Sequence, residues 1–124
     1  MEYDILVADD NSSFRLVMST VFRDAGFSID VAKNGSDALK KFLTHKYSLI
    51  IVDLRMPVMD GEETINAIKK IDQDQPIVVI SAYDNGKRKE ILEAGASHFL
   101  TKPVDMDELL GVAQKFVGRY VSRR

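Results

Sequence analysis

From residue 49 the sequence runs Leu49-Ile50-Ile51-Val52 and then reaches Asp53. Four apolar, mostly β-branched residues without polar alternation are typical of a strand buried on both faces, as in a parallel sheet covered by helices. Runs of the same kind occupy residues 5–8 and 77–80. Two weaker candidates follow this pattern less closely: residues 28–32 alternate, and residues 97–100 are short. The chain is therefore expected to contain five strands.

Apolar residues at helical spacing fill the intervals between these strands. A stripe at i, i+3, i+4 and i+7 covers residues 14–25, shorter stripes lie within residues 38–43, 65–71 and 91–94, and the longest covers residues 106–120. Ser12 or Ser13 is expected to cap the first helix, and Gly26 to end it in the left-handed conformation. Asp60-Gly61 resembles a hairpin turn, but helical spacing follows it, so we interpret it as the start of a helix.

Strands that alternate with helices predict right-handed crossovers and a parallel sheet, the α/β class. The length of 124 residues suits one domain, and 45% hydrophobic and 29% charged residues argue against disorder.

The composition also excludes several classes of function. A net charge of -2 offers no overall attraction to nucleic acid or to an anionic membrane. The absence of cysteine excludes disulfides, thiolate zinc sites and cysteine nucleophiles. The longest apolar run has four residues, against the roughly 20 that a membrane helix needs. The N-terminus lacks the features of a signal peptide, so a cytoplasmic location is expected.

Polar residues stand directly after the predicted strands. Asp9-Asp10 follow the first strand, Asp53 the third, Ser81 the fourth, and Lys102 comes at the end of the fifth. In an open α/β sheet, ligands bind outside the carboxyl ends of the strands. We therefore expect three carboxylates, one hydroxyl and one ammonium group to line a single edge of the sheet.

This set of groups indicates phosphoryl transfer. Crowded carboxylates repel one another, and a hard divalent cation relieves that repulsion. Aspartates without histidine or cysteine suit Mg²⁺ or Mn²⁺ better than zinc or copper. Lys102 and Ser81 can bind phosphoryl oxygens, which leaves a carboxylate as the nucleophile.

With these residues in this order, the sequence resembles the response-regulator receiver domain of two-component signalling. The segment Asp53-Leu54-Arg55-Met56-Pro57-Val58-Met59-Asp60-Gly61 closely matches the phosphoacceptor loop of that family. The resemblance covers about residues 3–120. It implies a three-layer, doubly wound (βα)5 fold with a five-stranded parallel sheet in the order 2-1-3-4-5. The receiver domain would occupy residues 1–121, followed by a tail at residues 122–124.

The resemblance also implies the role of each acidic residue. Asp53 would accept a phosphoryl group from a histidine kinase, a histidine phosphotransfer protein or a small phosphodonor. Asp10, Asp53 and the backbone carbonyl of Arg55 would bind Mg²⁺, and Asp9 would act largely through a metal-bound water. The domain would catalyse its own phosphorylation and dephosphorylation without being an enzyme that turns over an external substrate.

The remaining family positions concern switching. Ser81 and Lys102 would bind phosphoryl oxygens, and the Lys102–Pro103 bond would be cis. Phe99 occupies the aromatic switch position, with Ser81 as its partner in the switch. Serine stands where the family also uses threonine, and phenylalanine where it also uses tyrosine.

Two bulky residues lie two positions beyond the acceptor and the hydroxyl residue. We hypothesise that Arg55 and Tyr83 shield the acyl phosphate from water and so tune its lifetime. The fourth helix, fifth strand and fifth helix would form the face that contacts a downstream protein or an output domain. The domain would be a monomer or a phosphorylation-dependent dimer, with no nucleic acid or membrane as its own partner.

Three other functions remain open at this point. A Mg²⁺-dependent aspartyl phosphohydrolase commonly needs a second aspartate two residues after its nucleophile, where this chain has Arg55. A nucleotide or FMN binder of flavodoxin type would be disfavoured by Asp9-Asp10, and neither G-x-x-x-x-G-K-[ST] nor G-x-G-x-x-G occurs. A phosphorylation-independent interaction module could keep the same fold, although the complete acidic site argues against it.

Overall fold

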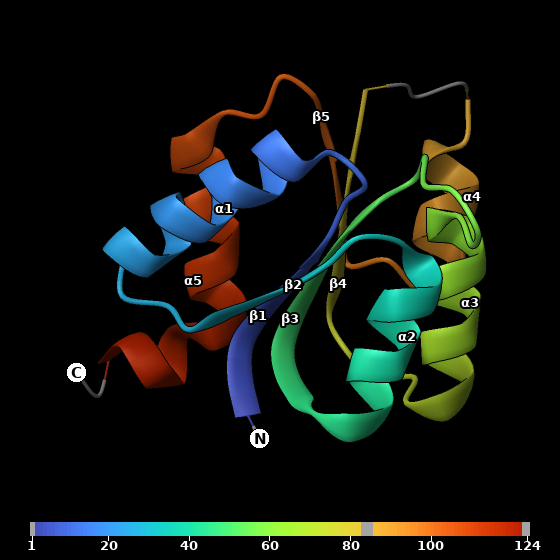
Figure 1. Ribbon diagram of the computed structural model, residues 1–124. Coiled ribbons are helices and arrows are strands. Elements are labelled where there is room, and N and C mark those ends of the chain that lie inside the picture. Colours follow the sequence, from blue (N-terminus) through green and yellow to red (C-terminus); the bar gives the residue numbers. More distant parts are fainter. Residues whose placement is uncertain (1, 83–85, 123–124) are drawn as a thin grey trace.

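Strands and helices alternate along the chain in the computed structural model, which describes residues 2–82 and 86–122 (Figure 1). The five strands found in these residues are β1 (Glu2–Ala8), β2 (Ile29–Ala32), β3 (Lys46–Asp53), β4 (Ile77–Ser81) and β5 (His98–Thr101). The five helices are α1 (Ser12–Asp24), α2 (Gly35–Thr44), α3 (Gly61–Ile71), α4 (Arg88–Glu93) and α5 (Met106–Ser122), the last with non-helical backbone angles at Val117. The predicted α/β class and element order are confirmed.

All pairs of neighbouring strands are parallel, and the sheet order is β2-β1-β3-β4-β5. This order confirms the 2-1-3-4-5 arrangement that the resemblance implied. The register sets Ala8 beside Val52, and Ser81 beside Thr101. Because the strands run in one direction, the residues that follow their carboxyl ends emerge along the same edge of the sheet.

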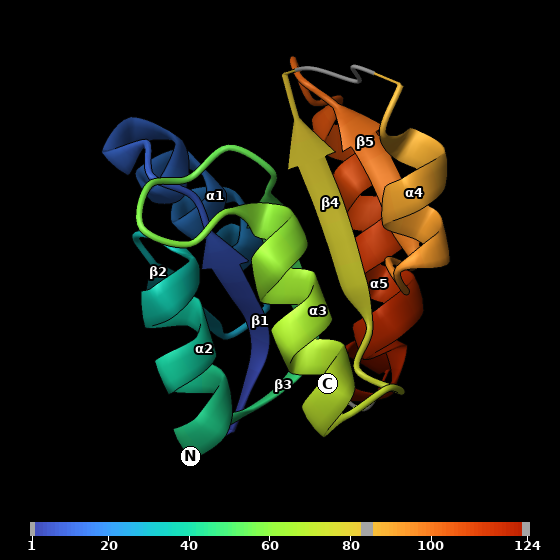
Figure 2. The same ribbon diagram turned by 90° about the vertical axis from the view of Figure 1, so that its right-hand side faces the viewer.

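Helices cover both faces of the sheet, which gives three layers. Helices α1 and α5 lie on one face, and α2, α3 and α4 lie on the other (Figure 1). Figure 2 shows α3 and α4 on the same side of the sheet, with β4 visible between them. Strand β1 illustrates the burial on both faces: Ile5 and Val7 pack in the cluster with Phe22 of α1, whereas Leu6 packs with Ile65 of α3. The apolar runs are thus buried on both faces, as their sequence predicted.

The start of α1 differs from the sequence prediction, because its N-cap is Asn11 rather than Ser12 or Ser13. Asn11 has extended backbone angles, and its side-chain oxygen accepts a hydrogen bond of 3.0 Å from the amide of Phe14. Asparagine caps a helix as well as serine does, and here the helix begins one residue earlier than a cap at Ser12 would allow and two residues earlier than a cap at Ser13 would allow. The predicted end is confirmed, since Gly26 follows the helix with a φ of 95°.

The start of α3 confirms the interpretation of Asp60-Gly61. The carboxylate of Asp60 accepts a hydrogen bond of 2.9 Å from the backbone amide of Glu63, and the Glu63 side chain accepts one of 3.3 Å from the backbone amide of Asp60. This reciprocal capping box satisfies two backbone donors at the helix end and fixes where the preceding loop stops. Within the described residues, none of the helices combines the length and apolar character that crossing a bilayer requires.

Candidate phosphoryl-transfer site

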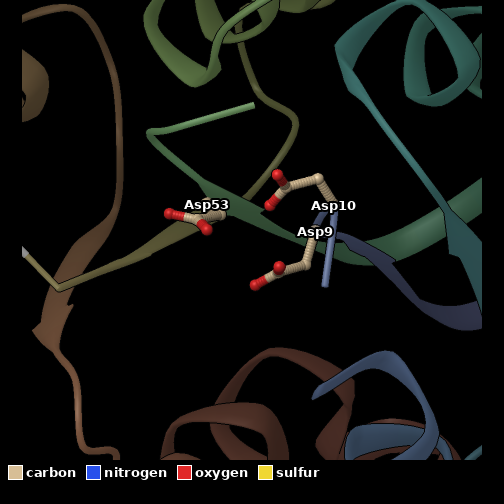
Figure 3. A group of neighbouring side chains, drawn as sticks. All are labelled: Asp9, Asp10 and Asp53. Atoms are coloured by element: carbon tan, nitrogen blue, oxygen red, sulfur yellow. The ribbon is translucent and has the colours of Figure 1, made fainter. Parts of the chain in front are cut away.

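Three carboxylates meet at the carboxyl ends of β1 and β3. Asp9 and Asp10 follow β1 and Asp53 ends β3, and one oxygen from each lies within 4.8 Å of the others. Figure 3 shows these side chains gathered at the ends of their two strands. Asp9 and Asp53 are buried, whereas Asp10 is exposed. The register of β1 and β3 explains this convergence, because Ala8 and Val52 are partners and the next residue of each strand is an aspartate.

The ammonium group of Lys102 links two of these carboxylates. Its Nζ donates to Asp9 Oδ2 at 3.0 Å and to Asp53 Oδ2 at 3.3 Å. The Lys102 side chain is 23% exposed and the Asp9 side chain only 2%, so solvent screens this pair less than an ion pair on the surface. Lys102 is held beside the end of β4 because its amide donates to the carbonyl of Ser81 at 2.9 Å.

Backbone amides hold the outer oxygens of the two buried carboxylates. The amide of Asn11 donates to Asp9 Oδ1 at 2.9 Å, and the amide of Arg55 donates to Asp53 Oδ1 at 3.3 Å. Arg15 of α1 also donates from Nη1 to the backbone carbonyl of Asp9 at 2.6 Å. Each buried carboxylate therefore has one oxygen held by an amide and the other by Lys102.

Close backbone contact between α3 and the end of β3 requires glycine at position 61. The amide of Gly61 donates to the carbonyl of Leu54 at 2.9 Å. A Cβ at position 61 would overlap the carbonyl oxygen of Asp53 and lie 2.7 Å from the Cα of Leu54. Glycine thus allows the first turn of α3 to approach the backbone of Asp53 itself.

The electrostatics of the site shift two pKa values. Burial and the nearby Asp9 carboxylate raise the pKa of Asp53, and Lys102 and the Arg55 amide only partly oppose them. Burial works to lower the pKa of Lys102, but its contacts with Asp9 and Asp53 outweigh burial and raise it. Lys102 is therefore a cation that partly neutralises the acidic cluster, and Asp53 is a carboxylate that loses its proton less readily than an exposed aspartate does.

Other residues singled out from the sequence lie around this centre. Ser81 is buried at the end of β4, and Arg55 is exposed just after Asp53. The Lys102–Pro103 peptide bond is cis, as the resemblance implied. Tyr83, the second residue expected to tune the site, lies outside the described residues.

Phe99 lies on β5, in the face formed by α4, β5 and α5, and is 4% exposed. Arg88, the first residue of α4, holds its guanidinium carbon 4.9 Å from the centre of the Phe99 ring. The sequence pattern does not predict this contact. The apolar pattern of α4 is weak, and nothing in its spacing indicates that Arg88 faces β5.

The acidic cluster is suited to a hard divalent cation. Three carboxylates within 4.8 Å, with no cysteine in the chain, form the donor set that Mg²⁺ prefers over softer metals. The exposure of Asp10 leaves one side of the cluster accessible to solvent. The arrangement can therefore combine a cation, an ammonium group and a buried carboxylate around an incoming phosphoryl group.

The fold and the acidic site together are those of a known family of signalling domains. Residues 5–114 match the response regulator receiver domain family. The chain belongs to that family, and it is a signalling module of two-component phosphorelays rather than a classical enzyme.

Solved structures agree with this assignment. The receiver domain of the Francisella response regulator 1452 is 31% identical, with a TM-score of 0.88 over 95% of this chain and 98% of that one. The response regulator TrrA from Thermotoga maritima, solved in complex with Mg²⁺-BeF, is 33% identical, with a TM-score of 0.84 over 92% of this chain and 98% of that one.

A curated relative, the transcriptional regulatory protein ZraR of Klebsiella oxytoca, is 36% identical over 109 residues, or 87% of this chain. The match covers 25% of that protein. The chain spans about a quarter to a half of the length of the curated relatives it matches.

Proposed function

We propose that this domain is a switch in which Asp53 accepts a phosphoryl group. The observation that carries the proposal is the convergence of Asp9, Asp10 and Asp53 with the ammonium group of Lys102. The donor would be a histidine kinase, a histidine phosphotransfer protein or a small phosphodonor. An oxygen of the Asp53 carboxylate would attack phosphorus and form a P–O bond. The bond from phosphorus to the donor would break, and the leaving group would keep the electron pair and take up a proton.

In this proposal the residues around Asp53 have separate roles in binding the metal ion and the phosphoryl group. Asp10, Asp53 and the backbone carbonyl of Arg55 would hold Mg²⁺, and Asp9 would act on it largely through a bound water; the ion when bound supplies positive charge against the phosphoryl oxygens. Lys102 would turn its ammonium group toward one phosphoryl oxygen and so offset negative charge as it develops. The hydroxyl of Ser81 would donate to another oxygen.

The signal would leave the site through Ser81 and Phe99. Movement of Ser81 toward the phosphoryl group would allow Phe99 to repack, and that would shift an equilibrium between two states of the face formed by α4, β5 and α5. This face has a hollow of about 360 Å³ whose lining includes Arg88, Phe99 and Glu108. Its partner would be a downstream protein or an output domain outside this chain.

Arg55 and Tyr83 would set how long the phosphorylated state lasts. Arg55 follows the acceptor by two residues and is exposed, so a long side chain at this position would extend between the acceptor and solvent. Replacing either residue by alanine should shorten the lifetime of the acyl phosphate, measured as loss of label after removal of the donor. An unchanged lifetime in both variants would contradict the shielding role.

The decisive experiment is phosphorylation in the test tube. Incubation with acetyl phosphate and Mg²⁺ should add one phosphoryl group to the intact chain, as measured by mass spectrometry. Asp53→Asn should abolish the addition, whereas Asp74→Asn, in the exposed loop before β4, should leave it unchanged. An unmodified wild-type mass would favour a phosphorylation-independent interaction module, and steady release of phosphate from unrelated monoesters would favour a phosphohydrolase.

A further inference from the structure

We propose that Phe14 is a positioning residue for phosphoryl transfer, and that its ring holds the ammonium group of Lys102 at the site. Phe14 lies in the first turn of α1, and the Nζ of Lys102 is 4.2 Å from the centre of its ring. This distance is well within the roughly 6 Å at which an ammonium group is attracted to an aromatic face. Phe14 is half-buried, so the contact is partly shielded from water.

The contact completes a closed circuit of four interactions. Asp9 Oδ1 accepts a hydrogen bond from the backbone amide of Asn11, and Asn11 Oδ1 accepts one from the backbone amide of Phe14. The Phe14 ring then contacts Lys102, whose Nζ returns to Asp9 Oδ2. The helix cap therefore fixes the backbone of Phe14 relative to the same carboxylate that Lys102 binds. A ring placed in this way can constrain the lysine side chain instead of following it.

This role rests on the proposed phosphorylation of Asp53, and the chemistry explains why a ring is needed. Lysine has a flexible four-carbon stem, and its ammonium group must be ordered to act on a phosphoryl oxygen. Both carboxylate partners of Lys102 would change their interactions during the reaction, because Asp53 would become an acyl phosphate and Asp9 would also serve the Mg²⁺ site. The Phe14 ring is the same before and after transfer. A cation–π contact also has no single donor direction, so the ammonium group can reorient while it stays in place.

A purely structural role for Phe14 makes a different prediction. Phe14 also packs at the margin of the core cluster under α1 and α5. If packing were its whole contribution, ring shape would matter and ring electronics would not. Replacing ring hydrogens by fluorine keeps the shape nearly constant and withdraws electron density from the ring face, so it separates the two roles.

The test is a series with one, two and three fluorines on the phenylalanine at position 14, introduced site-specifically. The rate of phosphorylation by acetyl phosphate at saturating Mg²⁺ should fall step by step, to about fivefold below wild type for the trifluoro ring. That factor corresponds to about 1 kcal/mol, since 1.36 kcal/mol is tenfold in rate. Trifluorophenylalanine at Phe116, in α5, is the matched control and should leave the rate unchanged. Phe14→Leu should slow the reaction at least as much as the trifluoro ring does. Phe14→Trp, which keeps an electron-rich aromatic face, should be phosphorylated at about the wild-type rate.

A second measurement needs no phosphorylation. The Hε protons of Lys102 should show an upfield ring-current shift in the NMR spectrum of the full chain, and Phe14→Leu should remove it. If the wild type is phosphorylated and the rate of phosphorylation is the same for all the fluorinated variants, the role of Phe14 is overturned. A wild-type chain that takes no phosphoryl group would overturn the proposed function instead, while the ring-current shift would still report on the contact.

Discussion

The guanidinium group of Arg88 lies over the ring of Phe99, with its central carbon 4.9 Å from the ring centre. Arg88 begins α4 and Phe99 belongs to β5, so the contact joins two elements of the proposed output face. Phe99 has no hydroxyl group, so packing and this cation–π contact favour its present position. Repacking of Phe99 would have to break the contact, which makes Arg88 part of the energy balance between the two states.

We therefore expect Arg88→Ala to shift that balance before any phosphorylation. A cation–π contact at an exposed site is worth about 0.5–1 kcal/mol, equivalent to about a two- to fivefold change in the ratio of the two states. Aromatic ¹³C NMR of Phe99, with beryllofluoride and Mg²⁺ as the reference for the active state, would measure the populations. Lys89→Ala, at the next exposed position, is the control, and equal populations in both variants would refute the role of Arg88.

The acidic cluster predicts an unusual effect of removing a charge. Asp10→Asn should raise the melting temperature in the absence of divalent ions, because it relieves repulsion from Asp9 and Asp53. Asp10 is exposed, so the gain should be of order 1 kcal/mol, or about 3–6 °C for a domain of this size. Differential scanning calorimetry in a chelator would measure it, and a lower melting temperature would contradict the predicted repulsion.

The effect of Asp10→Asn on stability should reverse when Mg²⁺ is added. The ion stabilises the folded wild type in proportion to the logarithm of its concentration over the dissociation constant. Asp10→Asn should lose most of this increase, so the wild type should become the more stable protein at high Mg²⁺. Asp74→Asn, which is remote from the cluster, should keep the full increase.

The raised pKa of Asp53 predicts how stability depends on pH. The folded state binds the Asp53 proton more tightly than the unfolded chain, whose carboxyl pKa is about 3.9. Between about pH 3.9 and the raised pKa, the folded state binds more protons than the unfolded chain, so the free energy of unfolding falls as the pH rises. Above the raised pKa, the full loss of stability caused by the buried charge of Asp53 is present. Asp53→Asn removes the penalty. Urea denaturation without metal should show the variant to be more stable at neutral pH, with a difference that narrows below about pH 4.

The close approach at Gly61 predicts opposite effects for two glycine-to-alanine changes. Gly61→Ala places a methyl group against the carbonyl of Asp53 and should cost about 2 kcal/mol or more of unfolding free energy. Gly111→Ala lies at an exposed position of α5, where the added methyl group meets nothing within 4 Å, and it should stabilise the helix by about 0.5–1 kcal/mol. Chemical denaturation of both variants tests the pair, and a neutral Gly61→Ala would mean that α3 can shift away from the end of β3.

The sequence was sufficient to predict the architecture because the strongest signals coincide with buried strands. The run at residues 49–52 is apolar throughout, and β3 is buried there from Leu49 to Asp53. The ends of strands were less predictable. Strand β1 begins at Glu2, earlier than the apolar run, because the Asp4 carboxylate accepts the amide of Ser28 at 2.8 Å. Strand β3 includes Tyr47, whose hydroxyl donates to Asp30 at 2.7 Å. These hydrogen-bond partners are distant in sequence and allow polar side chains to lie within a strand. The pattern of neighbouring residues does not reveal them.

The candidate site was predictable for a related reason, and its supporting contacts were not. Parallel strands bring their carboxyl ends to one edge, so Asp9 and Asp53 could be expected to meet without knowledge of side-chain positions. The contacts of Phe14 and Arg88 depend on the rotation of α1 and α4 about their axes. In the sequence, Phe14 is one member of an apolar stripe and Arg88 one of three consecutive basic residues, at positions 87–89. Neither pattern distinguishes a contact with Lys102 or Phe99 from ordinary packing or solvation.

The bond between Lys102 and Asp9 joins residues that are 93 positions apart. During synthesis, the aspartates leave the ribosome long before the lysine that partly neutralises them. Until residue 102 has emerged, a partly made chain carries the acidic cluster without its fixed cation, and β5 cannot complete the sheet. Under the proposed function, competence to accept a phosphoryl group would therefore arise late in translation, once the last strand is in place, and a truncated product that ends before β5 would not be phosphorylated.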